Sequence, residues 1–311
     1  MAHLTAPDGT PPSALTYGCM QFGDTADEDA ARTMYLACRE RGVNMFDTAH
    51  TYSDGASERM LGALVGADRD ALIVASKADF KRGSSARALA RSCAESRERL
   101  NIDTIDLYYL HRFDPDVPLD ESIEAMARLQ SDGHIRHIGV SNFAAWQVMK
   151  AQAAAARHGT RIAAIQPMLN LVKRQAEVEL LPMAVDQGIA AFPYSPLGGG
   201  LLTGKYDAGG GGRLKTSEMY AQRYGEGWMH ATAQALAALA QEAGIAPATL
   251  AVAWAMRRPG VTAPIISARD VGQLAPSLDA LDAAPDAAIM SRVEALSHAP
   301  APATDRTEET R

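Results

Sequence analysis

Cysteine, long apolar runs and net positive charge are all scarce in this chain. Its 311 residues include only three cysteines, Cys19, Cys38 and Cys93. An odd and sparse set argues against a disulfide framework and favours reduced thiols in a cytoplasmic protein. No apolar run reaches the length of a transmembrane helix, and the polar start MAHLTAPDGTPPS is unlike a signal peptide. We therefore predict a cytoplasmic protein with no membrane partner.

The charge balance is acidic. A formal net charge of −7 at pH 7 gives no general attraction to nucleic acid. The hydrophobic share of 47% is that of a globular protein with a sizeable core. No repeat or domain boundary is evident, so we predict one domain over residues 1–311, with flexible ends at 1–12 and 299–311 and a flexible glycine-rich loop at 207–215. Nothing in the sequence indicates a particular oligomeric state.

Short apolar runs recur along the chain, separated by segments of helical periodicity. Continuous apolar character is typical of parallel strands that are covered on both faces. The predicted strands lie within 14–23 and at 43–47, 71–76, 105–110, 137–141, 163–166, 190–195 and 263–267. The predicted helices span 27–41, 57–66, 84–100, 120–132, 144–157, 181–187, 230–242 and 248–258. This alternation predicts an α/β protein with a (β/α)8 TIM barrel. An open doubly wound sheet is the alternative, but YGCMQFG lacks its usual G-x-G-x-x-G turn.

The stretch FDTAHTYSDGASE, residues 46–58, places a carboxylate and a phenol directly after one predicted strand. Asp, Ser, Gly and Thr are also turn formers, so this stretch could simply end a strand. In a (β/α)8 barrel, however, the carboxyl ends of the strands surround the active site. Successive strand ends carry Asp47 with Tyr52, Lys77, His111, Ser141 with Asn142, Gln166, and Tyr194 with Ser195.

Two of these strand-end residues have opposite charges. Charged groups inside a ring of strand ends are costly unless they pair, so Asp47 and Lys77 are expected to form an ion pair. A nearby ammonium stabilises a phenolate. Lys77 is therefore expected to lower the pKa of Tyr52 from about 10 toward the range of a working proton donor.

The order and spacing of the motifs resemble those of the aldo-keto reductases, from about residue 13 to about 295. The matching motifs are FDTAHTY, ASK, LHR, SDGHIRHIGVSN, IQPMLN, FPYSPLGGGLLTGKY and PIISARDVGQL. The resemblance implies a catalytic set of Asp47, Tyr52, Lys77 and His111. It also implies reversible hydride transfer between NADPH and an aldehyde or ketone, in which Tyr52 donates the proton and His111 orients the carbonyl oxygen.

The resemblance assigns the cofactor contacts as well. Ser141, Asn142 and Gln166 would hold the nicotinamide carboxamide, and Tyr194 would stack on its ring. The loop from Ser195 to Lys205 would wrap the pyrophosphate, and Arg269 would meet the adenosine 2′-phosphate at the start of a short helix. The implied cofactor set is Ser141, Asn142, Gln166, Tyr194, Ser195, Pro196, Leu197, Gly199, Leu201, Gly204, Lys205, Ser267, Arg269 and Gln273. No metal is implied.

Four positions depart from the usual family pattern. Ser267 stands where Gly is common, and Ser277 stands where an adenine-contacting Asn is usual. Asp270 follows Arg269, and its charge would oppose a 2′-phosphate unless its side chain caps the helix. The expected cofactor is accordingly NADPH/NADP+, with NADH possible. Met20 replaces an aromatic residue near the nicotinamide, which would widen the substrate pocket.

Other functions can be built from parts of the sequence. GGLLTGKY nearly matches a phosphate-binding loop, but Tyr206 replaces the hydroxyl residue that would bind Mg²⁺. A metal-dependent barrel hydrolase could use Asp47, His50 and His111 as ligands, although Lys77 would repel the metal. A third alternative is a non-enzymatic NADPH-binding redox sensor or channel-associated subunit of the same fold. Substrate-pocket residues stay open between lining and packing: His50, Phe80, Phe113, Trp146 and the segment 206–228.

Overall fold

Eight parallel strands form the centre of the molecule in the computed structural model, which describes residues 4–206, 209–283 and 285–309. They are β1 (Thr16–Gly18), β2 (Met45–Asp47), β3 (Ile73–Lys77), β4 (Ile105–Leu110), β5 (Ile135–Ser141), β6 (Ile162–Gln166), β7 (Ala190–Ala191) and β8 (Ile265–Ile266). Their order is β7-β6-β5-β4-β3-β2-β1-β8. A parallel bridge between Tyr194 and Ile265 joins the two ends of this sheet. The predicted (β/α)8 barrel is thereby confirmed.

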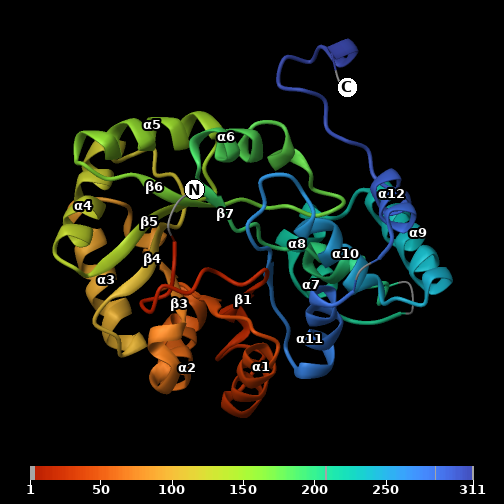
Figure 1. Ribbon diagram of the computed structural model, residues 1–311, viewed down its shortest axis with the longest axis horizontal. Coiled ribbons are helices and arrows are strands. Elements are labelled where there is room, and N and C mark those ends of the chain that lie inside the picture. The colour runs from red at the N-terminus through yellow and green to blue at the C-terminus, as the bar shows by residue number, and fades with distance from the viewer. Residues whose placement is uncertain (1–3, 207–208, 284, 310–311) are drawn as a thin grey trace.

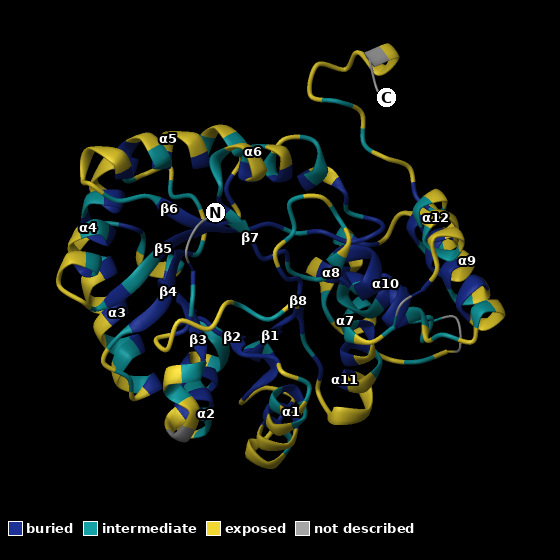
Figure 2. Cartoon of the chain, viewed as in Figure 1, coloured by how far each residue is buried: buried dark blue, intermediate teal, exposed yellow. Residues whose placement is uncertain are grey.

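Helices surround the strands on the outside (Figure 1). The first six strands are each followed by one helix: α1 (Glu28–Glu40), α2 (Ala56–Val65), α3 (Ala86–Leu100), α4 (Leu119–Ser131), α5 (Ala145–Arg157) and α6 (Leu180–Gln187). Four helices follow β7: α7 (Arg213–Thr216), α8 (Glu218–Arg223), α9 (Gly227–Ala243) and α10 (Pro247–Met256). After β8 come α11 (Val271–Leu278) and α12 (Ala287–Ala295). The strands are buried while the outer helix faces are exposed (Figure 2), as continuous apolar strands and amphipathic helices require.

The last strands are shorter than the sequence predicts. The run 190–195 yields a two-residue strand, and its ladder continues only through single contacts such as the Tyr194 N–H to the Pro167 carbonyl at 2.9 Å. Pro167 and Pro193 have no N–H to donate, so regular pairing cannot continue past them. The short helices α7 and α8 and the helix α12 were not predicted.

The N-terminal segment packs against the barrel, contrary to the expectation of a flexible end over residues 1–12. Leu4 and Ala6 are buried among side chains of the barrel interior, which include Tyr109 and Phe192. The Arg136 guanidinium also donates a hydrogen bond of 2.6 Å to the Thr5 carbonyl. Apolar burial at these two positions explains the order. Residues 1–3 lie outside the described part.

Two more segments were expected to be flexible, the C-terminal end 299–311 and the glycine-rich loop 207–215. Most of the chain after residue 299 is exposed and extends away from the barrel (Figure 1). The glycine-rich segment 207–215 ends in α7, and its residues 207–208 are not among those that the structure describes.

One glycine of β5 shapes the barrel interior. A Cβ atom at Gly139 would lie 2.5 Å from the ring of Tyr109 on β4, which is closer than real Cβ contacts come. The glycine therefore makes room for a tyrosine directly below the strand ends. In the described residues, no single helix is long and apolar enough to span a membrane; α9 and α10, bent by 103°, pass that test only as a pair.

Candidate active site

A cleft of about 1860 Å³ opens at the carboxyl ends of the strands. Most of the predicted site residues line it: Asp47, Tyr52, His111, Ser141, Asn142, Gln166, Tyr194, Ser195, Pro196, Leu197, Gly199, Lys205, Ser267, Arg269 and Gln273. Three others do not line it. Lys77 lies beneath the cleft floor, Leu201 is buried, and Gly204 ends a short 3-10 helix with φ near +75°.

An ion pair lies at the floor of the cleft. The Lys77 ammonium is 2.5 Å from the Asp47 carboxylate, and it also donates a hydrogen bond of 2.8 Å to the Thr48 carbonyl. The Tyr52 hydroxyl lies 3.3 Å from the same ammonium. Lys77 and Asp47 are buried. The expected ion pair therefore exists, and it brings a phenol within hydrogen-bond range of a buried cation.

Parallel register explains why these groups meet. Asp47 of β2 is paired with Ala75 of β3, and Lys77 lies two residues further along the same strand. Side chains two residues apart on a strand share one face. The Gln166 side chain on β6 donates a hydrogen bond of 2.9 Å to the other Asp47 oxygen, so both oxygens are satisfied.

The loop that carries Tyr52 is tightly turned. Ser53, Asp54 and Gly55 have φ values of 48°, 50° and 86°, in the left-handed region. The guanidinium of Arg99 on α3 packs against Gly55, where a Cβ would lie 2.7 Å away, and donates a hydrogen bond of 3.1 Å to the His50 carbonyl. Turn and guanidinium together fix the position of the phenol over Lys77.

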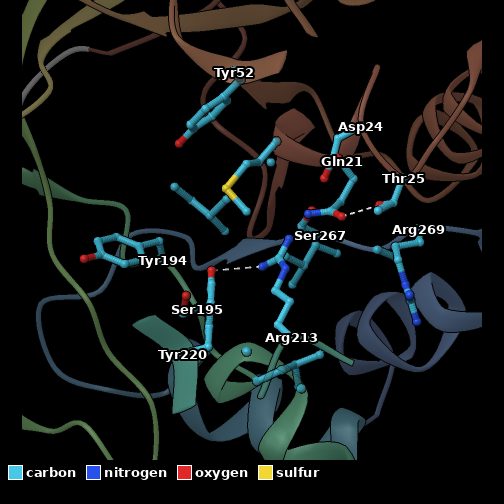
Figure 3. A pocket seen from close by; sticks show the side chains of 18 of the residues that line it. Gln21, Asp24, Thr25, Tyr52, Tyr194, Ser195, Arg213, Tyr220, Ser267 and Arg269 are labelled. Carbon is cyan, nitrogen blue, oxygen red and sulfur yellow. Dashed lines mark hydrogen bonds between the residues drawn. The ribbon is translucent and has the colours of Figure 1, made fainter. Parts of the chain in front are cut away.

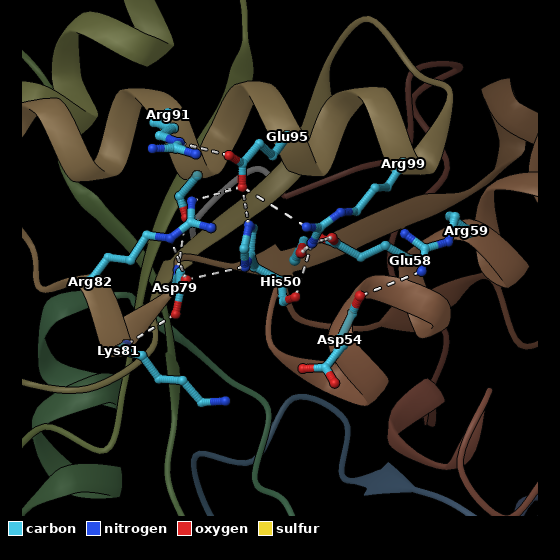
Figure 4. A network of polar contacts seen from close by, with 12 residues as sticks. His50, Asp54, Glu58, Arg59, Asp79, Lys81, Arg82, Arg91, Glu95 and Arg99 are labelled. Atoms are coloured by element: carbon cyan, nitrogen blue, oxygen red, sulfur yellow. Dashed lines mark hydrogen bonds and ion pairs between the residues drawn. The ribbon is translucent and has the colours of Figure 1, made fainter.

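A polar network behind the loop adds to this support (Figure 4). The Glu95 carboxylate on α3 contacts His50 at 2.7 Å, Arg82 at 2.8 Å and Arg91 at 2.8 Å. Arg91, then His50 and Arg82, lower the pKa of Glu95 to about 2. His50 is thus engaged by Glu95 and does not line the cleft, which corrects its candidate roles as a pocket residue and as a metal ligand.

Burial governs the ionisation of the floor residues. It raises the pKa of Tyr52, and the lowering effect of Lys77 offsets this only in part. The expected lowering by Lys77 is therefore present, but the net direction is upward, so the phenol keeps its proton at neutral pH. Burial disfavours a charged Lys77, yet Asp47 and Tyr52 outweigh this and raise the pKa of Lys77. Burial also raises the pKa of Asp47, although the Lys77 charge and the hydrogen bonds from Lys77 and Gln166 act to lower it.

His111 follows β4 and faces Tyr52. The two rings meet edge to face, with centroids 5.9 Å apart. Burial, then the charges of Lys77 and Arg112, lower the pKa of His111 to about 3. The imidazole is therefore neutral near pH 7, with one protonated and one unprotonated nitrogen. Its Nδ1 is buried without a hydrogen-bond partner in the described residues.

The ionisation of His111 predicts a pH effect on stability. An unfolded chain binds a proton on histidine near pH 6.5, whereas folded His111 binds one only near pH 3. Stability should therefore fall as the pH drops below about 6.5. We expect His111→Gln to lose less stability than the wild type between pH 7 and pH 4.5, as measured by urea unfolding. The control is His158→Gln, at an exposed position after α5. If the free energy of unfolding of His111→Gln fell with pH as steeply as that of the wild type, the prediction would be contradicted.

The wall beside His111 carries amide and hydroxyl groups. The Asn142 side chain donates a hydrogen bond of 3.0 Å to the His111 carbonyl and accepts one of 2.8 Å from the Tyr194 hydroxyl. Asn142 comes directly after β5, and Ser195 comes four residues after the end of β7. Both have φ near +60°, and this backbone conformation directs their side chains. Ser141 is buried and donates a hydrogen bond of 3.1 Å to the Gln166 carbonyl.

The opposite end of the cleft is basic. Burial, then the charges of Arg269 and Arg213, lower the pKa of Lys205, which indicates three cations close together. Figure 3 shows Arg213 extending between Tyr194 and Arg269, and it donates a hydrogen bond of 3.1 Å to the Tyr220 hydroxyl. None of the three has a carboxylate partner within the described ranges. Such a cluster fits a phosphate group.

The glycine loop between β7 and these cations has an unusual backbone. Gly198, Gly199 and Gly200 all have positive φ, at 57°, 66° and 95°. A Cβ at Gly199 would lie 2.7 Å from the Tyr220 ring. Only glycine can follow this path at that separation, and such a path exposes backbone N–H groups to an anion.

Asp270 caps α11, as one sequence interpretation proposed. Its carboxylate accepts hydrogen bonds from the Gln273 N–H at 2.9 Å and from the Gln273 side chain at 2.7 Å. Both carboxylate oxygens thus face the helix start. Ser277 is buried and its hydroxyl has no hydrogen-bond partner in the described structure.

Several cleft residues were missed or left undecided at the sequence level. Two of them had a signal in the sequence: Arg213 directly follows four glycines, and Arg112 directly follows His111. Tyr220 and Arg223 fall in the segment 206–228, whose role was left open. Phe80 and Phe113 line the cleft, whereas Trp146 is 62% exposed outside it.

No cluster of three His, Cys, Asp or Glu side chains with metal-binding geometry occurs in residues 4–206, 209–283 and 285–309. The candidate ligands Asp47 and His50 are engaged by Lys77 and Glu95, respectively. The metal-hydrolase alternative therefore has no structural support.

Comparison with known proteins agrees with this geometry. A sequence model of the aldo/keto reductase family matches residues 14–298. The chain is 33% identical over 298 residues to the uncharacterized oxidoreductase YrpG of Bacillus subtilis (strain 168), covering 89% of this chain and 90% of that protein. It is 30% identical over 290 residues to a probable voltage-gated potassium channel subunit beta of Arabidopsis thaliana, covering 88% of each. It is 36% identical over 195 residues to aflatoxin B1 aldehyde reductase member 2 of Rattus norvegicus, covering 61% of this chain and 53% of that one. The chain belongs to the aldo/keto reductase family of oxidoreductases.

Proposed function

We propose that the protein reduces aldehyde or ketone carbonyls with NADPH. The observation that carries this proposal is the buried Lys77 ammonium, which lies 2.5 Å from the Asp47 carboxylate and 3.3 Å from the Tyr52 hydroxyl at the cleft floor. The phenol holds a proton at neutral pH and lies where it can pass it to a substrate oxygen. A bound nicotinamide would supply the hydride.

Each floor residue has one task in this proposal. Tyr52 donates its proton to the carbonyl oxygen as negative charge develops there. Lys77 stabilises the phenolate that remains, and Asp47 holds Lys77 in place. Neutral His111 donates an N–H hydrogen bond to the same oxygen and fixes the orientation of the carbonyl. In the reverse direction, the phenolate accepts the proton of an alcohol.

The cofactor contacts are proposed along the cleft. Ser141, Asn142 and Gln166 would hold the nicotinamide carboxamide, with Tyr194 against its ring. One Gln166 N–H is used by Asp47, and the amide oxygen accepts a long hydrogen bond of 3.4 Å from the Ser141 hydroxyl. The amide has its second N–H and a second lone pair on that oxygen left for the cofactor. The backbone of the loop from Ser195 through Pro196, Leu197, Gly199, Leu201 and Gly204 to Lys205 would face the pyrophosphate. Ser267, Arg269 and Gln273 would face the adenosine end.

A consumption assay tests the proposal. Purified protein is mixed with NADPH or NADH and a panel of aldehydes and ketones, and absorbance at the reduced-cofactor band is followed. NADPH oxidation that depends on the carbonyl compound and on the protein supports the proposal. Cofactor binding without turnover across the panel would instead favour the non-enzymatic sensor, an alternative that the similarity to a channel subunit keeps relevant.

Cofactor preference gives a sharper prediction. Within the part of the chain that the structure describes, the Arg269 side chain makes one hydrogen bond, a long one of 3.5 Å to the Gln273 side chain, so its guanidinium can turn to an anion. Hydrogen bonds to charged groups contribute about 1.5–3 kcal/mol, which corresponds to about tenfold or more in affinity. We expect Arg269→Ala to weaken NADPH binding by about tenfold or more and to leave NADH nearly unchanged, in fluorescence titrations.

A surface arginine provides the control for this titration. Arg87 lies exposed on α3, outside the cleft, so Arg87→Ala removes the same charge without touching the adenosine end. Equal losses of NADPH and NADH affinity in Arg269→Ala would show that Arg269 does not bind the 2′-phosphate.

A further inference from the structure

The cleft contains more unpaired basic side chains than a cofactor phosphate requires. No ion pair to a carboxylate occurs in the described residues for six of its lining side chains: Lys81, Arg112, Lys205, Arg213, Arg223 and Arg269. Outside the cleft, some arginines, such as Arg39, Arg128 and Arg292, are ion-paired, whereas exposed helix arginines such as Arg32 and Arg87 have solvent around them. The cleft differs in that its cations gather around one concave surface. Unpaired cations around a concave surface concentrate anions there.

Five of the six cations fall into two groups, and Lys81 is left outside both. Lys205, Arg213 and Arg269 are close enough to affect one another and lie at the end already proposed for phosphate. Arg112 and Arg223 form the second group: Arg112 directly follows His111, and both arginines act electrostatically on Tyr194. The Tyr220 ring contacts both Arg223 and Arg213, so the two groups adjoin there. A neutral carbonyl substrate gives no reason for this second group.

The side chain of Arg112 is held close to the reacting groups. Its guanidinium carbon lies 4.2 Å from the centre of the Phe80 ring. That ring meets His111 edge to face, with centroids 5.1 Å apart. Arg112 is therefore separated from His111 by a single aromatic ring, and stacking fixes its planar fork.

Arg223 reaches the same region from α8. Its guanidinium carbon lies 5.5 Å from the centre of the Tyr220 ring, which also lines the cleft. The side chain is half-buried, so part of its hydration is already lost and its attraction for an anion is strengthened.

The nearby carboxylates are not partners for these two arginines. Asp114 uses one oxygen for the Ser84 N–H and the other for the Asp116 N–H. Asp47 is paired with Lys77. Asp24 and Asp54 line the cleft but are exposed, and neither lies within ion-pair distance of a described arginine.

We propose that the substrate is an aldehyde or ketone that carries a carboxylate, held by Arg112 and Arg223 while its carbonyl faces Tyr52. This inference rests on the proposed reductase function. The remaining walls near the carbonyl are Met20, Phe80 and Phe113, which suit a flat apolar body between the two polar groups. Two guanidinium groups can each form paired hydrogen bonds to a carboxylate.

A matched pair of aldehydes tests the substrate class. 4-Formylbenzoate and 4-formylbenzamide have the same shape, but only the first carries a charge. With NADPH, the wild type should have a kcat/KM at least about tenfold higher for 4-formylbenzoate. Arg112→Gln and Arg223→Gln should each reduce this preference at least about fivefold, mainly by raising KM for 4-formylbenzoate. Arg32→Gln, which removes an exposed charge from α1, should leave the preference unchanged.

The outcomes separate the two levels of the proposal. Equal kcat/KM for the two aldehydes, or an unchanged preference in both cleft variants, would overturn the carboxylate assignment while the reductase function stands. Failure to reduce either aldehyde, together with failure on the wider carbonyl panel, would remove the reductase function and this inference with it.

Discussion

Tyr52→Phe is expected to lose carbonyl reduction by about 10²-fold to 10⁴-fold in kcat, the usual contribution of a general acid. Among the described residues, three groups lie within hydrogen-bond distance of the Lys77 ammonium: the Asp47 carboxylate, the Thr48 carbonyl and the Tyr52 hydroxyl. Of the three, the phenol is the one that holds a proton to donate to a substrate. The substitution removes one oxygen and keeps the ring, so the edge contact with His111 is retained. Cofactor affinity should therefore stay close to that of the wild type.

The matched control for this variant lies across the cleft. Tyr220→Phe removes a phenol that bonds to Arg213 and not to Lys77, so its kcat should fall far less. Stopped-flow single turnovers, with cofactor binding measured separately, distinguish a loss of chemistry from a loss of binding. A Tyr52→Phe protein with near wild-type kcat would remove Tyr52 as the proton donor.

Much of the fold could be predicted because its signals are local and repeated. The strand β4 matches its apolar run 105–110 at both ends, and each of α1 to α6 lies within two residues of its predicted bounds. The misses have separate physical causes. β7 is cut short by Pro193, and α7 has only four residues, too few for a periodic pattern.

The site was less completely predictable. Asp47, Lys77 and Tyr52 could be placed together because parallel strands bring their ends to one edge. The net direction of the shift in the Tyr52 pKa could not be predicted, since it depends on how far burial outweighs the Lys77 charge. The contacts of His50 with Glu95, and of Arg112 with Phe80, depend on loops whose course one sequence does not determine.

Lys77→Met is the second substitution with a large expected effect, and it tests whether lysine and tyrosine act as one unit. Without the ammonium, the influences that remain on the phenol are burial, the Asp47 charge and Tyr220, and all of them raise the pKa of Tyr52. The phenolate left after proton donation would then be unstable, so reduction should fall about as far as in Tyr52→Phe. The double variant should lose little more than either single variant, because groups acting together give non-additive losses.

The fold of this variant needs its own check. Removing one member of a buried ion pair typically costs about 3–5 kcal/mol, since the other charge stays buried. Gln166 still donates to Asp47, which limits but does not cancel that cost. Urea unfolding and circular dichroism therefore precede the kinetics, and assays are run at a temperature at which the variant is folded.

Asp47→Asn is the comparison that assigns the roles. The amide keeps the shape of the carboxylate, and Lys77 retains its contacts with the Thr48 carbonyl and the Tyr52 hydroxyl. Its ammonium can still stabilise the phenolate, although Asp47 no longer holds it in place. Activity should therefore fall less than in Lys77→Met, and the dependence of the reduction rate on pH should stay closer to that of the wild type. If folded Asp47→Asn lost more activity than folded Lys77→Met, the carboxylate would contact the chemistry directly and the lysine would be the supporting group.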